Sequence, residues 1–124
     1  MDIDTGDRRA LGARGEDYAA AFLTRAGLRI IDRNWRCRDG EIDLVAWEEP
    51  TRTIVVVEVK TRRSVAFGSP IEAVTQVKAH RLRRLAARWA RDHDAHAAAL
   101  RVDVIGVLVA RDGSYQLEHL RDVA

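Results

Sequence analysis

The stretch TIVVVEVK, residues 53–60, decides the fold of this chain. A run this apolar and rich in β-branched residues is typical of a central strand that is buried on both faces. Side chains alternate along a strand, so Val55, Val57 and Val59 should lie on one face, and Glu58 and Lys60 on the other. A carboxylate and an ammonium in such a strand must be paired or open into a cleft. The simpler alternative is a surface Glu–Lys pair at the strand end.

On either side of this stretch, hydrophobic periodicity and turn residues predict further helices and strands. In chain order we expect a helix at Leu11–Ala26, strands at Leu28–Trp35, Glu41–Trp47 and Thr53–Lys60, a helix at Ile71–Arg91, and strands at Leu100–Val109 and Tyr115–Glu118. Short turns between the first three strands predict an antiparallel meander, whereas the long second helix allows a parallel crossover. The sequence therefore predicts an α/β fold, a mixed sheet flanked by helices in the order α-β-β-β-α-β-β.

The composition is that of an ordinary globular protein, with 47% hydrophobic and 32% charged residues. We expect one domain spanning residues 1–124, with the polar residues 1–9 flexible. The charged N-terminus does not resemble a secretory signal, and no apolar run is long enough to span a bilayer. A single cysteine, Cys37, excludes an internal disulfide. A cytoplasmic protein without membrane contact is the expectation, and a net charge of +2 does not by itself predict a nucleic-acid partner.

A second acidic position strengthens the case for a site. In the segment GEIDL, residues 40–44, Glu41 and Asp43 should point to one face of a strand, and Ile42 and Leu44 to the other. If this strand forms a hairpin with residues 53–60, Asp43 lies beside Glu58. Two neighbouring carboxylates repel each other unless a cation lies between them, and Mg²⁺ prefers such oxygen ligands together with water. Lys60 could then position a water or stabilise charge in a transition state.

Two more acidic residues are open to alternative interpretations. Glu16 lies on the flank of the first helix and could reach the same cleft, but an ordinary solvated glutamate near a helix start is the alternative. Asp103 interrupts an apolar strand and is either a structural partner of an arginine or a residue at the cleft edge. The sequence leaves both alternatives open.

The second helix carries a group of basic residues. Lys78 falls in the middle of an apolar stripe, where it must meet anions or reach water at the end of the helix. The stripe consists of Ile71, Val74, Leu82, Leu85 and Trp89. A basic ridge on an adjoining arc consists of Arg81, Arg84, Arg88 and Arg91. A solvated charged face is the default interpretation of such a ridge, and contacts with phosphates are the alternative.

Taken together, these residues resemble the YraN-like family of small bacterial proteins, and the match runs from Leu11 to His119. The motifs that carry it are Gly12-x-x-Gly15-Glu16-x-x-Ala19, Arg33-Asn34-x-Arg36, Gly40-Glu41-Ile42-Asp43-Leu44, Val57-Glu58-Val59-Lys60, Lys78, and Arg101-x-Asp103-Val104. The family is similar in turn to Holliday-junction resolvases and other restriction-endonuclease-like (PD-(D/E)xK) proteins. The resemblance implies a catalytic set of Glu16, Asp43, Glu58 and Lys60, with Mg²⁺ held by Asp43, Glu58 and the Val59 carbonyl. One departure is Ala79, where many relatives carry glutamine.

The leading hypothesis is a metal-dependent endonuclease that hydrolyses phosphodiester bonds in DNA, with branched DNA as one candidate substrate. It would use Mg²⁺ or Mn²⁺ and bind phosphates through Lys78, Arg81, Arg84 and Arg88. Two symmetric cuts in a four-way junction would require a homodimer. The first alternative is a nucleic-acid-binding protein that kept the fold with little or no catalysis. The second is an interaction protein whose carboxylates are structural.

Overall fold

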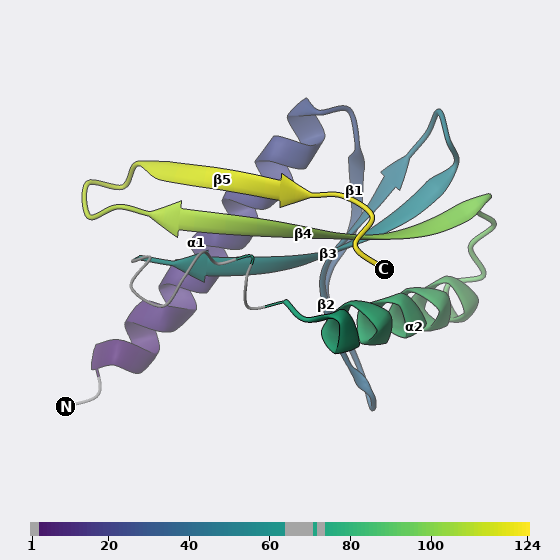
Figure 1. Cartoon of the computed structure of the whole chain (residues 1–124), viewed down its shortest axis with the longest axis horizontal. Helices are drawn as coiled ribbons and strands as arrows, with labels where there is room; N and C mark the ends of the chain where they lie inside the picture. The colour runs from purple at the N-terminus through teal and green to yellow at the C-terminus, as the bar shows by residue number, and fades with distance from the viewer. Residues whose placement is uncertain (1–2, 64–70, 72–73) are drawn as a thin grey trace.

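The computed structural model describes residues 3–63, 71 and 74–124, which form a five-stranded sheet and two helices (Figure 1). In chain order these are α1 (Ile3–Arg25), β1 (Arg29–Cys37), β2 (Gly40–Glu48), β3 (Thr53–Arg62), α2 (Gln76–Asp92), β4 (Ala99–Val109) and β5 (Tyr115–Leu120). The α/β class and the order of elements predicted from the sequence are confirmed.

The sheet is mixed, and its strands lie side by side in chain order. β1, β2 and β3 form an antiparallel meander, whereas β3 and β4 pair in parallel from Thr53↔Ala99 to Arg62↔Leu108. β5 then returns antiparallel to β4. A parallel pair needs a crossover connection, and α2 is part of the segment that provides it. The meander and the crossover therefore follow the prediction.

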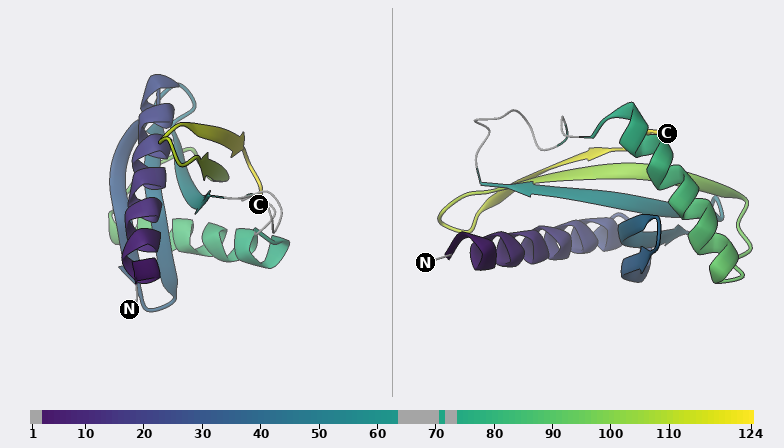
Figure 2. Two further views of the ribbon diagram at one scale, coloured as in Figure 1. Left: turned by 90° about the vertical axis from the view of Figure 1, so that its left-hand side faces the viewer. Right: turned by 90° about the horizontal axis from the view of Figure 1, so that it is seen from below.

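The two helices lie on opposite faces of the sheet, as Figures 1 and 2 show. Residues of α1 pack with one set of strand side chains, which includes Val55 and Val57, and we call this the α1-side core. Residues of α2 pack with another set, which includes Ile54 and Val56, and this is the α2-side core. Neighbours along β3 thus alternate between the two cores, and all four are almost completely buried. The expected central strand with two buried faces is confirmed.

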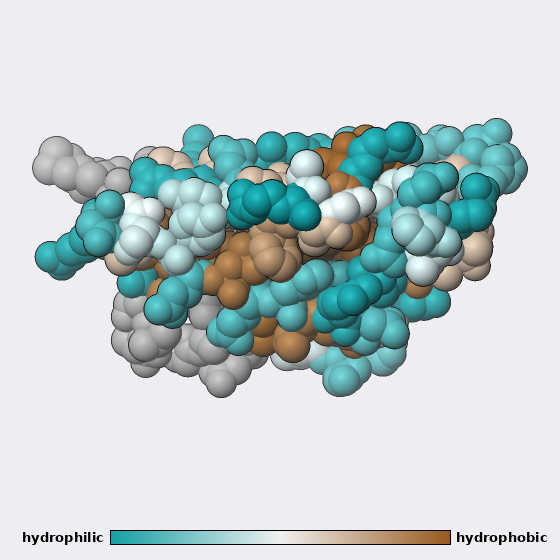
Figure 3. All heavy atoms as spheres, turned by 90° about the horizontal axis from the view of Figure 1, so that it is seen from above, coloured by the Kyte–Doolittle hydropathy of each residue, from teal (hydrophilic) through white to brown (hydrophobic). Residues whose placement is uncertain are grey.

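The surface in Figure 3 is largely hydrophilic, with apolar atoms visible mainly in the middle of that face. In the part of the chain that the structure describes, neither helix has the length and apolar character needed to cross a bilayer.

Both helices begin at other residues than expected. α1 begins at Ile3 rather than Leu11, since the apolar periodicity marks only the part of the helix that packs on the sheet. Residues 3–9 continue the helix, and their flexibility stays a prediction. α2 begins at Gln76 rather than Ile71, because the Thr75 hydroxyl accepts a hydrogen bond from the Lys78 amide and caps the helix there. Positions 72–73 of the expected helix lie outside the described residues.

β2 changes faces at Asp43, which contradicts the simple alternation expected for this strand. Ile42 belongs to the α2-side core, but Leu44 belongs to the α1-side core, so the expectation that they share a face was wrong. The neighbouring position of β1 is Asn34, which lies between the paired residues Arg33↔Leu44 and Trp35↔Ile42 and has a positive φ of 53°. Asparagine tolerates this left-handed conformation better than most residues. The irregular backbone at this point places Asp43 where two strands separate.

Candidate functional site

The candidate site lies where β2 and β3 separate. Within the described strands, their pairing runs from Glu48↔Thr53 to Leu44↔Val57 and continues no further. The next β3 amide on that side, Val59 N–H, donates to Asp43 Oδ2 at 2.8 Å. A carboxylate therefore takes the place of a neighbouring strand. The amide and carbonyl of one strand residue point to the same side, so the Val59 carbonyl also faces this gap.

Acidic residues from three other positions surround Asp43. Burial raises the pKa of Asp43 to about 7, the Val59 amide opposes that rise, and Glu58, Glu16 and Glu41 add to it by repulsion. The structure therefore brings three of the predicted catalytic residues, Glu16, Asp43 and Glu58, into electrostatic contact.

Glu16 reaches this cluster from α1. Burial raises the pKa of Glu16, while a hydrogen bond with Asn34 and the charge of Arg33 oppose the rise. Its side chain is only 20% exposed, and Arg33 Nη2 lies 3.9 Å from Glu16 Oε1. This environment differs from the fully solvated glutamate that was the alternative. Close packing at the neighbouring Gly15 brings α1 in, because a Cβ there would overlap the Thr61 side chain of β3.

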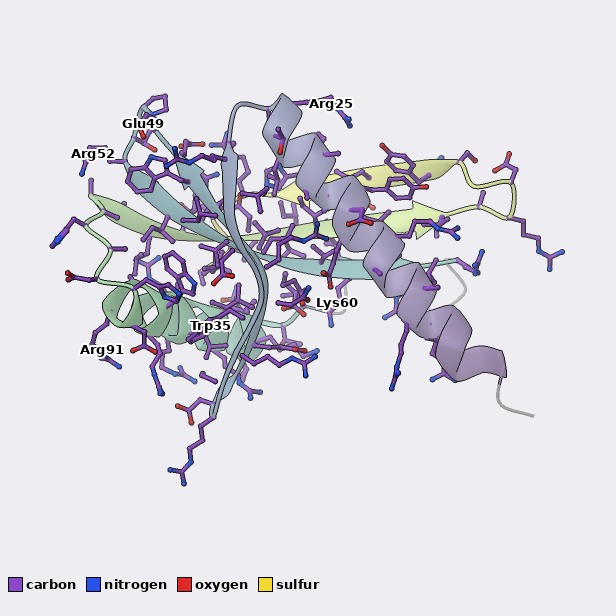
Figure 4. All side chains as sticks on the ribbon, turned by 180° about the vertical axis from the view of Figure 1, so that it is seen from behind. Arg25, Trp35, Glu49, Arg52, Lys60 and Arg91 are labelled. Atoms are coloured by element: carbon purple, nitrogen blue, oxygen red, sulfur yellow. The ribbon has the colours of Figure 1, made fainter. Side chains whose placement is uncertain are left out.

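The fourth predicted residue, Lys60, pairs with Glu58. Lys60 Nζ lies 3.1 Å from Glu58 Oε1, and the two side chains are 29% and 19% exposed. In Figure 4, Lys60 lies near the place where the β1–β2 hairpin passes β3, far from Arg25 and Arg91 at the helix ends. This ion pair is the arrangement expected for the simple alternative, but it borders the acidic cluster around Asp43.

The donor set suits one kind of metal site. Among the described residues, no group of three or more His, Cys, Asp or Glu side chains is placed to hold an ion. Mg²⁺, however, usually keeps several waters and takes only one or two carboxylates. Asp43, Glu58 and the Val59 carbonyl are oxygen donors of this kind, and a cation beside Asp43 would favour the charged carboxylate that burial and repulsion disfavour. The residues present therefore fit Mg²⁺ in a hydrated site and do not fit a closed protein cage.

Glu58 also lines a pocket of about 560 Å³. It lies between the β1–β2 hairpin and α2, and its other lining residues are Arg36, Cys37, Arg38, Gly40, Glu41, Val74, Lys78, Arg81, Leu82 and Leu85. Lys78 is exposed at this pocket, so it does not lie buried within the apolar stripe. The buried face of α2 consists instead of Ala79, Leu82, Leu85, Ala86 and Trp89. The later start of α2 explains the difference, because Ile71 and Val74 precede the helix.

The predicted basic ridge lies next to this pocket. Arg81, Arg84, Arg88 and Arg91 line a second depression of about 480 Å³ together with Asp39 at the hairpin tip. Arg81 Nη2 donates to the Asp39 carbonyl at 2.8 Å, and Arg88 Nη1 lies 3.2 Å from Asp39 Oδ2. Two ridge arginines are thus partly engaged within the fold, and Arg84 and Arg91 extend the positive surface.

Asp103 is a structural residue. Its side chain is fully buried, Arg101 Nε and His119 Nε2 lie 2.9 and 2.8 Å from its carboxylate, and the Asp122 amide donates to it at 3.0 Å. These hydrogen bonds hold the pKa of Asp103 below its ordinary value despite burial. Arg101 also pairs with Glu48 at 3.2 Å. The alternative that placed Asp103 at the cleft edge is excluded.

Sequence reasoning missed several residues of the site. Glu41 acts on Asp43 and pairs with Arg36 at 3.2 Å, whereas Asn34 supports Glu16. The Asp-Gly turn signal predicted the position of the hairpin. The contact between the hairpin tip and α2 depends on long-range hydrogen bonds to Asp39, which no local sequence pattern predicts. Asn34 belongs to a motif already singled out, so its participation could have been suggested.

The sequence profile described as "Uncharacterised protein family UPF0102" matches residues 15–107, which is most of the chain and includes the whole acidic cluster. The chain belongs to the UPF0102 family. Curated UPF0102 proteins are similar over nearly their whole lengths. One from Beutenbergia cavernae is 57% identical, covering 92% of this chain and 95% of the relative. One from Arthrobacter sp. (strain FB24) is 51% identical, and the match covers 91% of this chain and 94% of the relative. One from Mycolicibacterium smegmatis is 49% identical, covering 99% of both. The YraN-like resemblance is thereby confirmed.

Proposed function

We propose that this UPF0102 protein is a metal-dependent endonuclease that hydrolyses phosphodiester bonds in DNA. The observation that carries the proposal is Asp43, a half-buried carboxyl close to three other carboxylates at the point where two strands separate. Repulsion among these carboxylates destabilises the fold unless a bound ligand neutralises their charge. Carboxyl groups with a raised pKa beside a pocket are typical of functional sites. A divalent cation is the ligand that these oxygens favour.

Asp43, Glu58 and the Val59 carbonyl would hold Mg²⁺, with Mn²⁺ as a substitute. When bound, the ion would supply positive charge to a phosphate and its attacking water. Hydrolysis joins the oxygen of water to phosphorus and breaks one P–O ester bond, and the leaving oxygen takes up a proton. The ammonium of Lys60 lies at the edge of the cluster, where it can orient that water or stabilise developing negative charge. Glu16 would position the cluster from the side of α1.

The basic surface next to the cluster supports a polyanionic substrate. Lys78 and Arg81 line the same pocket as Glu58, and Arg84 and Arg88 line the adjoining depression. Cations placed along one helix can contact successive phosphates, and these contacts would weaken with added salt. DNA is the proposed substrate, and a four-way junction would require two copies of the site in a homodimer.

The test is cleavage of labelled four-way junction, flap and linear duplex DNA with Mg²⁺ or Mn²⁺. Wild type is compared with Asp43→Asn and Lys60→Gln, which keep size but remove charge. Asp94→Asn is the matched control, because Asp94 is almost fully exposed beyond α2 and its positive φ of 50° suits asparagine. Cutting by wild type and the control, but by neither site variant, is the expected result. If the protein instead binds DNA without cutting it, and if neither Asp43→Asn nor EDTA changes the affinity, it is a nucleic-acid-binding protein without catalysis.

A further inference from the structure

The pocket beside the acidic cluster has two walls of different origin. One wall comes from the β1–β2 hairpin, including Arg38, and the other comes from α2 and the residues that lead into it, including Lys78. Glu58 of β3 also lines it, so the pocket adjoins the proposed cleavage site. A group of the substrate adjacent to the reacting phosphate would therefore have to enter it or pass over it.

The lining of this pocket combines apolar and cationic groups. Leu82 and Leu85 are buried residues of the α2-side core and form an apolar floor. Around that floor lie Arg38 and Lys78, whose side chains are exposed. In the described part of the chain, neither side chain is paired with a carboxylate, whereas Arg81 is bound to the hairpin tip. An apolar floor with unpaired cations at its margin fits a flat, weakly polar group attached to a phosphate.

Contacts between the hairpin and α2 hold the two walls at a fixed separation. The Asp39 carbonyl accepts from Arg81, and its carboxylate pairs with Arg88. Bidentate and charge-assisted contacts of this kind restrict movement of the hairpin tip relative to the helix. The pocket is therefore formed before ligand binds, which lowers the entropic cost of binding.

The dimensions allow a single nucleotide to enter. A volume of about 560 Å³ falls within the range of pockets that hold small ligands. In a duplex, the faces of each base are covered by stacking and its inner edge by pairing. A base can reach an apolar floor only after it leaves the stack, and that is least costly where the strand is already single.

Building on the proposed nuclease function, we infer that this pocket receives one unstacked nucleotide of a DNA strand beside the cleavage position. The substrate class is then single-stranded DNA, or the single-stranded part of a flap or junction, rather than continuous duplex. Arg84 and Arg91 continue the positive surface past Asp39, where they contact the next phosphates of the same strand. The nucleotide base lies on Leu82 and Leu85, and Lys78 contacts its phosphate.

The test uses Cys37, the one cysteine of the chain, which lines this pocket and is partly buried. The full-length protein is treated with iodoacetamide in EDTA, and alkylation is followed by mass spectrometry. The reaction is repeated with saturating single-stranded DNA of about 12 nucleotides, and with the same sequence as a blunt duplex. We expect the single strand to slow alkylation about tenfold, as stacking on a pocket floor would do, and the duplex to leave it nearly unchanged.

A charge variant gives a second readout. Lys78→Gln should weaken single-strand binding in fluorescence anisotropy and reduce the slope of log affinity against log salt by about one. Arg25→Gln is the matched control, because Arg25 is an exposed cation at the far end of α1 (Figure 4). The control should keep both the affinity and the slope of wild type to within about a factor of two.

Equal protection of Cys37 by duplex and single strand, or single-strand binding without protection, would overturn this inference. Cleavage of continuous duplex without any protection would overturn it and leave the nuclease proposal standing. Protection by single strands in a protein that cuts nothing would support the pocket assignment and remove the catalytic proposal.

Discussion

Replacing Asp43 by asparagine should stabilise the metal-free protein at alkaline pH. Asparagine has nearly the same size, and its side-chain oxygen can still accept the hydrogen bond from the Val59 amide. It carries no charge, however, and so it removes the repulsion by Glu58, Glu16 and Glu41. A substitution that abolishes activity and increases stability is the pattern expected where a site is strained for function.

The magnitude follows from the two pKa values. The carboxyl has an ordinary pKa of 3.8 in the unfolded chain and a pKa of about 7 in the folded protein. Between these values the folded state binds a proton that the unfolded state has lost, so the free energy of unfolding falls as pH rises. The loss in free energy of unfolding that comes from ionising Asp43 is absent below pH 3.8 and complete above pH 7, where it amounts to roughly 4 kcal/mol. Between pH 5 and pH 8 it grows by about 3 kcal/mol.

Urea unfolding at pH 5 and pH 8 in EDTA, followed by tryptophan fluorescence, measures this difference. The advantage of Asp43→Asn over wild type should increase by about 3 kcal/mol between the two pH values, and Asp94→Asn should show no such increase. Adding Mg²⁺ at pH 8 should stabilise wild type but not Asp43→Asn. An advantage that is equal at both pH values, or a variant that is less stable at pH 8, would refute the argument.

Four further substitutions test the packing around the site, each by urea unfolding. Gly15→Ala should destabilise the protein by about 1–3 kcal/mol, because the new Cβ overlaps Thr61, whereas Gly12→Ala meets no neighbouring atom and should stabilise α1 by up to about 1 kcal/mol. Equal effects at the two glycines would contradict the close approach of α1. Asp103→Ala should cost about 3–5 kcal/mol at pH 7, because Arg101 and His119 lose their fully buried partner and Arg101 keeps only Glu48. That loss should shrink as pH falls below 3.8 through the lowered pKa of the carboxyl. Trp89→Phe should cost about 1 kcal/mol through the lost hydrogen bond to Asp32, and an unchanged stability would speak against that bond.

The sequence predicted the order of elements because each carries a strong local signal. The β-branched run of residues 53–60 and the Asp-Gly turn both act within a few residues. Helix starts were predicted less well, since the start of α2 depends on one cap, Thr75, and the first turns of α1 lie before the periodic part. The change of face at Asp43 was also missed, because simple alternation assumes a regular strand.

The acidic cluster was predicted in part. Placing Asp43 on the strand next to Glu58 required only the hairpin, and the structure brings the two together. Glu41 was expected on the same face as Asp43 but was not singled out as a site residue, and its repulsion acts on the Asp43 carboxyl. The structural alternative for Asp103 proved right, since it pairs with Arg101, but its second partner, His119 of β5, lies beyond any local pattern.

The hydrogen bond between Val59 and Asp43 makes one backbone proton a spectroscopic probe of the site. The amide of a strand residue normally senses a carbonyl, whose charge never changes, but this one senses a group that titrates near neutral pH. The ¹H–¹⁵N resonance of Val59 should therefore move through pH 7 in wild type and stay fixed in Asp43→Asn. Because the signal requires neither substrate nor turnover, it reports cation binding to the acidic cluster directly.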